Sequence, residues 1–325
     1  MRNHPFVSKL GKHMADFVES KRACGRRYDT EFRRLQELDR LLEAEGLSSE
    51  QLPQRLVEKW IAKRKGERPN TQRIRISLVR QFTTYLHSCG IPAYILNKHT
   101  TPIIRNDYCP YIYTRAEIHA MVSAADSLQP CREQARYHII MPVLIRLLYC
   151  CGLRIGEALK LTRGDYLKKE ALLLVRNGKF GVSRQIPLSG TIQKRIEFHL
   201  DTGCSSGKEA SLFESRYGRP FHQVHIRELN RQLMKTAGVQ YGGKSKGPRI
   251  HDYRHTFAVH RLEQWLREDV DLNAMLPYLA TYMGHASLRG TQYYLRLTAA
   301  IFPELSHKME DAVGRFIRRA INEKK

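Results

Sequence analysis

GLRIGEAL, residues 152–159, places Arg154 between two aliphatic side chains. The run before it, residues 137–151, is apolar enough for a buried helix, and a glycine directly after such a run is typical of a helix end. A guanidinium group in apolar surroundings needs an anionic partner. Arg154 is therefore either half of an ion pair with Glu157 or a ligand for a bound anion.

A second polar motif, HDYRHTFA, spans residues 251–258. His251 and Arg254 are three positions apart, so they share one face of a helix. An imidazole beside the planar fork of a guanidinium suits the binding of phosphate oxygens. Taken alone, however, a histidine in a basic protein is more often a surface or core residue than a catalyst.

The third motif lies near the C-terminal end, where residues 279–286 read LATYMGHA and residues 291–294 read TQYY. Gly284 and His285 indicate a helix end, and Tyr294 follows nine residues after His285 on the next helical segment. A tyrosine considered alone usually packs in a core, so Tyr294 gains meaning only from the other motifs.

Residues 171–188 differ from their helical surroundings and predict two short strands joined by a turn at Asn177 and Gly178. Lys179 follows the turn directly. This position favours Lys179 over the other nearby lysines as a candidate site residue. Those alternatives are Lys168, Lys169 and Lys194. The sequence therefore predicts a mainly α fold with one small β-sheet, an α+β arrangement.

The first 90 residues predict a separate helical domain, because apolar residues recur at helical spacing in four segments. Basic residues on the polar faces and in the loops could contact DNA phosphates, although any one of them taken singly is better explained as a solvated side chain. The candidates for DNA contacts are Arg26, Arg27, Lys63, Arg73, Arg75 and Arg80.

Prolines interrupt the periodicity over residues 91–113, which predicts an interdomain linker. Thr114 and Glu117 have the spacing of a capping box, so we expect a second domain over residues 114–325. Its end, residues 301–320, has the pattern of an amphipathic helix.

The composition points to a polyanionic partner. The chain has 325 residues with 55 Lys and Arg against 32 Asp and Glu, a net charge of +23, which favours DNA or RNA over a membrane. No apolar stretch is long enough to span a bilayer, and no secretory leader is visible. The odd number of cysteines, seven, without a C-x-x-C pair indicates reduced thiols. We expect a cytoplasmic, nucleoid-associated protein.

Taken together, the motifs resemble those of the tyrosine recombinase family, also called the phage integrase family. Its pattern is G-[LM]-R-x-[GS]-E, a lysine on a β-hairpin, H-x-x-R-H, L-G-H and T-x-x-Y. Two departures are Met283 where the family has leucine, a volume-conserving exchange, and the doubled tyrosine, Tyr293 and Tyr294. The likeness covers residues 114–300 and, more loosely, the helical first domain. The matching positions are Arg154, Glu157, Lys179, His251, Arg254, His255, His285 and Tyr294.

This resemblance implies a core-binding domain, a catalytic domain and DNA cleavage without a metal or other cofactor. Tyr294 is then the nucleophile that forms a 3′-phosphotyrosyl bond, while Arg154 and Arg254 bind the non-bridging oxygens. The other roles implied are proton donation to the leaving 5′-oxygen by Lys179, base or proton shuttle for His251, a phosphate hydrogen bond from His285, and orientation of these groups by Glu157 and His255.

Several functions fit this pattern. We favour an integrase or transposase of a mobile element, which would act on double-stranded DNA as a tetramer on two sites, with accessory bending or directionality factors. Alternatives are an Xer-type dimer resolvase, a type IB topoisomerase and a DNA-binding regulator without catalysis. A regulator has no need for Tyr294 and Lys179 together, which weighs against it.

Overall fold

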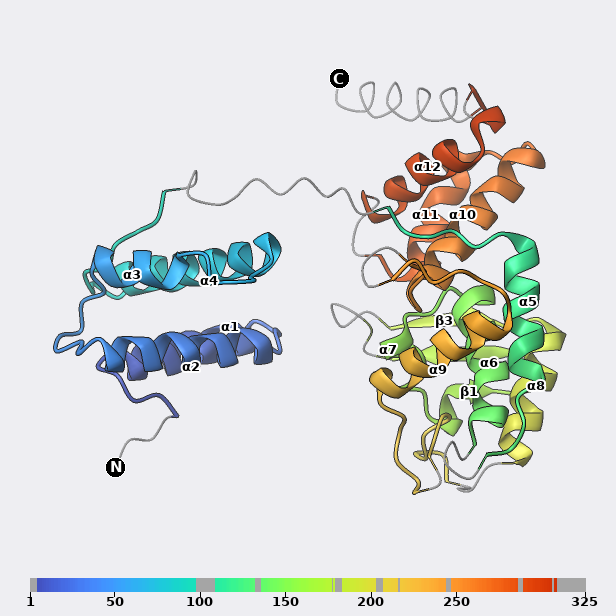
Figure 1. The fold of residues 1–325 in the computed structure, drawn as a ribbon, viewed down its shortest axis with the longest axis horizontal. Helices are drawn as coiled ribbons and strands as arrows, with labels where there is room; N and C mark the ends of the chain where they lie inside the picture. Colours follow the sequence, from blue (N-terminus) through green and yellow to red (C-terminus); the bar gives the residue numbers. More distant parts are fainter. Residues whose placement is uncertain are drawn as a thin grey trace. The chain divides into compact units, whose positions relative to one another are not determined.

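The computed structural model divides the chain into two compact units, Met1–Tyr108 and Cys109–Lys325. It describes residues 5–97, 109–131, 136–176, 178, 183–202, 207–215, 217–243, 247–285, 289–305 and 307–308. Both units are mainly helical (Figure 1). No helix among the described residues is both long and apolar enough to cross a membrane.

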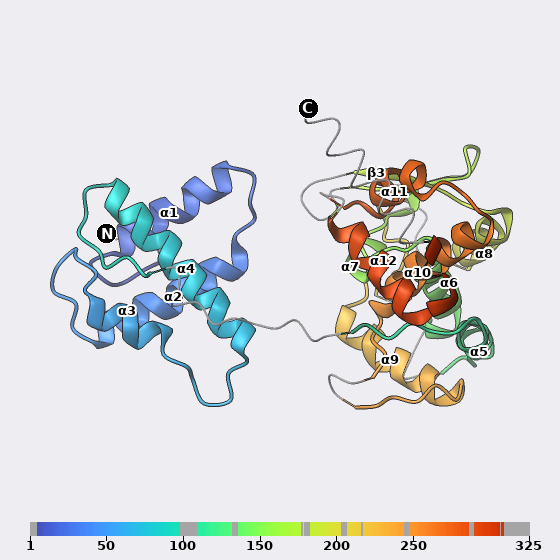
Figure 2. The ribbon, with the colours of Figure 1, turned by 90° about the horizontal axis from the view of Figure 1, so that it is seen from above.

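The first unit is a bundle of helices whose apolar faces meet in one core. α1 and α2 pack on each other, as do α3 and α4, and α4 also packs on α1 (Figure 2). The ring of Phe17 lies at the centre of this bundle, 5.5 Å from that of Phe82, and both side chains are buried. The helices are α1 (Gly11–Ala23), α2 (Asp29–Ala44), α3 (Gln54–Ile61) and α4 (Pro69–Ser88).

The segment predicted as a linker, residues 91–113, is packed at both of its described ends. The backbone N–H of Leu52 donates to the carbonyl of Pro92 over 3.0 Å, and Leu96 is buried in the first unit. At the other end, Tyr113 is buried in the second unit, where its ring stacks on that of Tyr253 at 4.9 Å. The prolines thus interrupt the helical pattern, but the described residues at each end of the segment still pack in the core of the unit to which they belong.

The second unit confirms the predicted fold class, mainly α with one small sheet. The sheet has the antiparallel order β1–β2–β3, and Leu173 opposite Ile186 supplies its buried face. The first of these strands is an addition to the predicted hairpin. The strands are β1 (Tyr166–Leu167), β2 (Leu172–Val175) and β3 (Arg184–Pro187), preceded by a 3-10 turn, η2 (Arg163–Asp165).

The helices of the second unit form two clusters of buried side chains. The apolar helix α6 fills the middle of the larger cluster, which also contains the sheet. The smaller cluster joins α10, α11 and α12 and includes Tyr294. The helices are α5 (Arg115–Asp126), α6 (Tyr137–Cys150), α7 (Ile155–Ala158), α8 (Gly190–Asp201), α9 (Gln223–Thr236), α10 (Asp252–Arg267), α11 (Leu272–Met283) and α12 (Arg289–Ile301).

The end of the chain differs from the prediction over residues 301–320. α12 already ends at Ile301, and a 3-10 turn, η4 (Pro303–Leu305), follows it. Residues 309–325, which hold most of the expected amphipathic helix, lie outside the described part of the chain. At the start of the unit, Thr114 and Glu117 do form the expected capping box at α5.

Arg75 is buried, so the prediction that it contacts DNA is wrong. Its side chain is 2% exposed and its Nη2 lies 2.6 Å from the Oε2 of Glu67, itself 6% exposed. Further bonds run to the carbonyls of Trp60 and Ala62. Arg75 therefore fastens the loop between α3 and α4 to the end of α3. Its carboxylate partner, Glu67, lies in that loop, where helical periodicity does not reveal it.

We expect Arg75→Ala to destabilise the protein by about 3 kcal/mol, because it leaves the carboxylate of Glu67 buried without its cation. Urea unfolding of the full chain measures this loss. Arg73→Ala is the matched control, since Arg73 is exposed on the same helix, and we expect a change below about 0.5 kcal/mol. Equal losses for both variants would contradict the structural role of Arg75.

Candidate active site

Arginines from three separate segments meet at the C-terminal end of α11. The carbonyl of Tyr282 accepts from Nε of Arg184 at 2.7 Å. The carbonyl of Met283 accepts from Nη2 of Arg254 at 2.6 Å, and that of Gly284 from Nη2 of Arg154 at 3.3 Å. The last carbonyls of a helix have no partner within it, and here guanidinium groups bond to them.

Gly284 shapes this helix end. Its backbone is left-handed, with φ +63°, and its N–H bonds to the carbonyl of Thr281 while that of His285 bonds to Ala280, both at 2.9 Å. Such a double bond closes a helix at a glycine. The turn directs His285 toward α12, where its Nδ1 lies 2.9 Å from Oγ1 of Thr291.

Gly152 makes a similar turn between α6 and α7, with φ +58°. A β-carbon there would lie 2.5 Å from the ring of Phe257, so only glycine lets this turn touch α10. Its carbonyl accepts from Nη1 of Arg254 at 2.6 Å. The turn thus holds Arg254 in place and sets Arg154 two residues further on at the start of α7.

Glu157 lies between two of the arginines. Its Oε1 accepts from Nη1 of Arg154 at 2.7 Å, and its Oε2 accepts from Nη2 of Arg184 at 2.8 Å. Burial alone would raise the pKa of Glu157, but the hydrogen bonds and charges of Arg184 and Arg154 outweigh it and lower the pKa to about 2. Glu157 is therefore ionised at neutral pH, and the ion-pair reading of the GLRIGEAL motif is correct for this contact.

Tyr294 lies on α12 inside the same cluster. It is 3% exposed, and its ring centre is 5.9 Å from that of His285 and 5.5 Å from that of His255. Burial raises the pKa of the Tyr294 phenol, while the charge of Arg254 and a hydrogen bond with it act in the opposite direction. The phenol, two imidazoles and a guanidinium group thus share one enclosed site.

The sequence and the fold of this chain are similar to those of known proteins. The family model described as the phage integrase family matches residues 112–300, more than half of the chain. The chain belongs to this family. Its members, the tyrosine recombinases, cleave and rejoin DNA through a tyrosine intermediate, and this chain is one of them.

The recombinase resembles individual proteins over most of its length. A Sinorhizobium fredii protein named integrase/recombinase y4rB is 27% identical over 314 residues, which cover 94% of this chain and 98% of that protein. Another from the same organism, y4rE, is 33% identical over 233 residues, 71% of this chain and 74% of its own. The solved Tn1549 transposon integrase, in complex with transposon right end DNA, shares the fold with a TM-score of 0.62 at 17% identity, over 87% of this chain and 94% of that chain.

The structure brings most of the predicted catalytic and orienting residues together. The exception is the hairpin lysine, Lys179, which lies outside the described residues. The cluster also contains Arg184, which the sequence interpretation missed. A signal was available, because Arg184 shares the buried face of β3 with Ile186 two positions on, and an arginine there needs a partner. The predicted residues of the cluster are Arg154, Glu157, His251, Arg254, His255, His285 and Tyr294.

Three histidines of the recombinase are neutral at physiological pH. Burial, aided by the charge of Arg254, lowers the pKa of His251 to about 4 and that of His285 to about 4. Burial and the neighbouring His251 lower the pKa of His255 to about 3. The rings of His251 and His255 are 4.9 Å apart. A neutral imidazole can accept a proton or donate a hydrogen bond, and therefore suits proton transfer.

Arg254 is the most enclosed cation of the cluster. It is 1% exposed, and burial followed by repulsion from Arg154 lowers its pKa to about 10. It still remains protonated at neutral pH. Within the described ranges, no group of three or more His, Cys, Asp or Glu side chains could hold a metal ion.

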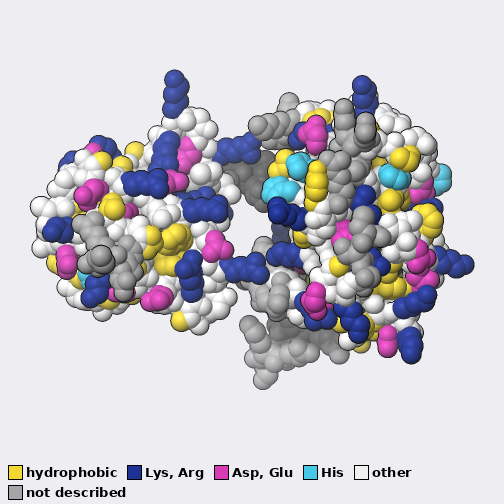
Figure 3. Space-filling view, turned by 90° about the horizontal axis from the view of Figure 1, so that it is seen from below, with side chains coloured by type: hydrophobic (Ala, Val, Ile, Leu, Met, Phe, Trp, Pro, Cys, Tyr) yellow, Lys and Arg dark blue, Asp and Glu magenta, His cyan; other side chains and the backbone are white. Residues whose placement is uncertain are grey.

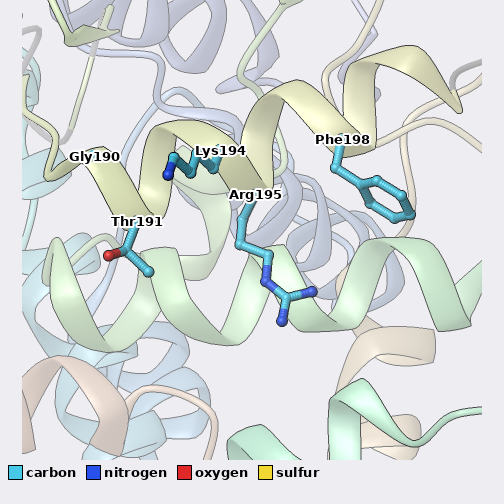
Figure 4. A pocket seen from close by; sticks show the side chains of 5 residues that line it. All are labelled: Gly190, Thr191, Lys194, Arg195 and Phe198. Carbon is cyan, nitrogen blue, oxygen red and sulfur yellow. The ribbon is translucent and has the colours of Figure 1, made fainter.

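A hollow on α8 is separate from this cluster. The hollow shown in Figure 4 has a volume of about 740 Å³ and is lined by residues of α8 alone: Gly190, Thr191, Lys194, Arg195 and Phe198. None of these side chains belongs to the arginine cluster. On the face shown in Figure 3, lysines and arginines are spread over each unit, with histidines on the second.

The lowered histidine pKa values predict a pH dependence of stability. Between about pH 6.5, where an unfolded histidine titrates, and about pH 4, the unfolded chain binds protons that folded His251, His255 and His285 do not. The free energy of unfolding should therefore fall as the pH falls through this window, by up to about 1.4 kcal/mol per pH unit for each imidazole.

Denaturant unfolding at several pH values checks this dependence. In His255→Gln the slope between pH 4 and 6 should be smaller than in the wild type, because one of these imidazoles is missing. His119→Gln, at an exposed position of α5, should leave the slope closer to that of the wild type. A slope that His255→Gln does not change would show that this imidazole titrates alike in both states.

Proposed function

We propose that this recombinase inserts or excises a mobile DNA element and that Tyr294 is its nucleophile. One observation carries the second part: the Tyr294 phenol is enclosed with Arg254 and with two neutral imidazoles. A phenol has a pKa near ~10 and attacks only when a base or cations assist it. Both kinds of assistance lie within this cluster.

The proposed reaction begins with attack of the Tyr294 oxygen on the scissile phosphorus. The new P–O bond to tyrosine replaces the bond between phosphorus and the 5′-oxygen, so the products are a 3′-phosphotyrosine and a free 5′-hydroxyl. Arg154 and Arg254 stabilise the charge on the non-bridging oxygens. Because the phosphoester energy is retained, a second 5′-hydroxyl can reverse the step and join a new partner strand.

Proton transfers complete the proposed mechanism. His251 accepts the phenolic proton, directly or through His255, whose ring lies between His251 and Tyr294 in the series of ring contacts. His285 bonds to Thr291 through its Nδ1, and its other ring nitrogen donates a hydrogen bond to the phosphate. Lys179, which the sequence predicts at the hairpin turn, donates the proton to the leaving 5′-oxygen. Side-chain cations replace metal ions in this scheme, so we propose that no cofactor is required.

We also propose that the first unit binds the backbone phosphates of the duplex. A hollow of about 380 Å³ on this unit is lined by Arg26, Arg73 and Arg80 from the loop before α2 and from α4, with Glu31 as an acidic member. Three arginines around one hollow, of which Arg80 also donates to the carbonyl of Asn97 at 2.9 Å, suit backbone phosphates better than three solvated side chains spread over a surface. Of the remaining candidates, Arg27 and Lys63 are exposed.

Support for a mobile element comes from the relatives. The similarity to y4rB, named an integrase/recombinase, extends over almost all of both chains. We further propose a homotetramer on two double-stranded DNA sites, assisted by accessory factors, in the cytoplasm. An Xer-type dimer resolvase is the second candidate, because it shares the same cleavage chemistry. Recombination assays that compare DNA carrying the ends of the element with DNA carrying chromosomal sites distinguish the mobile-element recombinase from the dimer resolvase.

We expect Tyr294→Phe to form no covalent adduct with a nicked suicide duplex that carries the element's end, because the attacking oxygen is missing. The wild type should form an adduct in the presence of EDTA, visible as a slow band on a denaturing gel. Tyr293→Phe is the control, because it removes the neighbouring phenol, and it should still form the adduct.

The outcomes separate the alternatives. An adduct that persists in Tyr294→Phe and disappears in Tyr293→Phe would assign the nucleophile to Tyr293. If the wild type bound the duplex and gave no adduct, the regulator without catalysis would be favoured. A wild-type adduct that forms without EDTA but not in its presence would show that the reaction needs a metal.

For the first unit, we expect Arg26→Gln with Arg73→Gln to weaken duplex binding and to reduce its salt dependence. Each lost phosphate contact lowers the slope of log K against log salt by about 0.9, so the double variant should lose about 1.8. Fluorescence anisotropy at several salt concentrations measures this slope.

The matched control for this experiment is Arg55→Gln with Lys59→Gln. It removes two exposed cations from the same unit, both of which are paired with Glu45. We expect its slope to stay near the wild-type value. Equal reductions in the two double variants would mean that net charge, and not the hollow, governs binding.

A further inference from the structure

Arg184 is fixed by hydrogen bonds to Glu157 and Tyr282, although none of the predicted motifs contains it. Its side chain is 5% exposed. It donates from Nη2 to Oε2 of Glu157 at 2.8 Å, from Nη1 to Oε1 of the same carboxylate at 3.3 Å, and from Nε to the carbonyl of Tyr282 at 2.7 Å. Such a two-oxygen contact fixes both the carboxylate and the guanidinium plane.

The space around Arg184 is also closed. A β-carbon at Gly284 would lie 2.9 Å from its Nη1, so the guanidinium group packs directly against the turn that carries His285. A lysine ammonium is a point charge on a flexible stem and cannot bond in the same plane to both oxygens of Glu157 and to Tyr282. The geometry thus selects arginine at this position.

The charges of the trio Arg154, Glu157 and Arg184 explain what Arg184 contributes. Glu157 alone would form a neutral pair with Arg154, whose charge would then be largely cancelled at a nearby phosphate. With Arg184 added, two cations share one carboxylate and the trio keeps a net charge of +1. Arg154 is 20% exposed whereas Arg184 is 5% exposed. Arg154 is therefore the cation that can meet the phosphate, and Arg184 the one that cannot.

We propose that Arg184 is a positioning residue for strand cleavage, which neutralises Glu157 so that Arg154 keeps its charge and orientation for the scissile phosphate. This inference rests on the proposed function of the site. A competing role is purely mechanical: Arg184 would only fasten β3 to the end of α11 through Tyr282. The two roles differ in what happens when Glu157 also loses its charge.

The test compares wild type, Arg184→Gln, Glu157→Gln and the double variant on the suicide duplex. Arg184→Gln should form the adduct about 100-fold more slowly, as for the loss of one group that stabilises transition-state charge. Its non-covalent affinity for the duplex should stay within about threefold of wild type, because Arg184 is buried. The double variant should recover at least about tenfold, since Arg154 then has no carboxylate to neutralise it.

Arg195→Gln serves as the matched control. Arg195 is an arginine of the same unit, 41% exposed and paired with an aspartate, so this variant removes the same charge and one ion pair away from the cluster. It should form the adduct within about threefold of the wild-type rate. A loss similar to that of Arg184→Gln would overturn the proposal in favour of a general charge effect.

Folding is checked by thermal unfolding of each variant. If Arg184→Gln alone fails to fold, the comparison of Glu157→Gln with the double variant decides, because removal of both partners of a buried pair is better tolerated than removal of one. With Glu157 neutral, loss of Arg184 should change the cleavage rate by less than about threefold. A further tenfold loss would establish the mechanical role and overturn ours.

Failure of the proposed function gives a different result. A wild type that binds the duplex without forming any adduct would overturn the cleavage chemistry itself and, with it, the role of Arg184. A wild type that forms the adduct, together with a double variant no faster than Arg184→Gln, would overturn only the charge role.

Discussion

The C-terminal end of α11 is the constraint on which the site depends. Its last carbonyls lack partners within the helix and form the negative end of the helix dipole. Tyr282, Met283 and Gly284 offer these oxygens to arginines of β3, α10 and the turn before α7. Because carbonyls carry only partial charge, they orient the cations without neutralising them. One helix end therefore assembles a positive site from segments far apart in the chain.

Gathering these cations has an electrostatic cost, which the pKa values record. Burial and mutual repulsion lower the pKa of Arg254 to about 10 and keep the neighbouring imidazole of His285 neutral, with a pKa of about 4. Glu157 offsets part of the repulsion but not all of it. The site is thus arranged in advance for an anion, and this arrangement is what a phosphate gaining charge in its transition state requires.

Much of this could be predicted from the sequence where neighbours in the chain act together. The helical bundle follows from its apolar spacing, the start of α5 from Thr114 and Glu117, and the cluster from motifs in a fixed order. Arg75 and Arg184 could not be placed in this way. Their carboxylate partners lie in a loop and in another helix, respectively. The position of Arg184 two residues from Ile186 indicates burial, but it does not identify Glu157 as the partner.

Tyr294 is enclosed beside the imidazoles of His255 and His285. A phenol that is 3% exposed reacts little with solvent, and its neighbouring imidazoles are neutral because burial disfavours their charge. An arriving phosphate brings negative charge to these cations, which lowers their repulsion and favours the protonated form of each imidazole. Under the proposed mechanism, substrate binding would therefore strengthen the bases that accept the phenolic proton. In that mechanism, the burial that lowers the histidine pKa values in the free site would also make proton transfer depend on bound DNA.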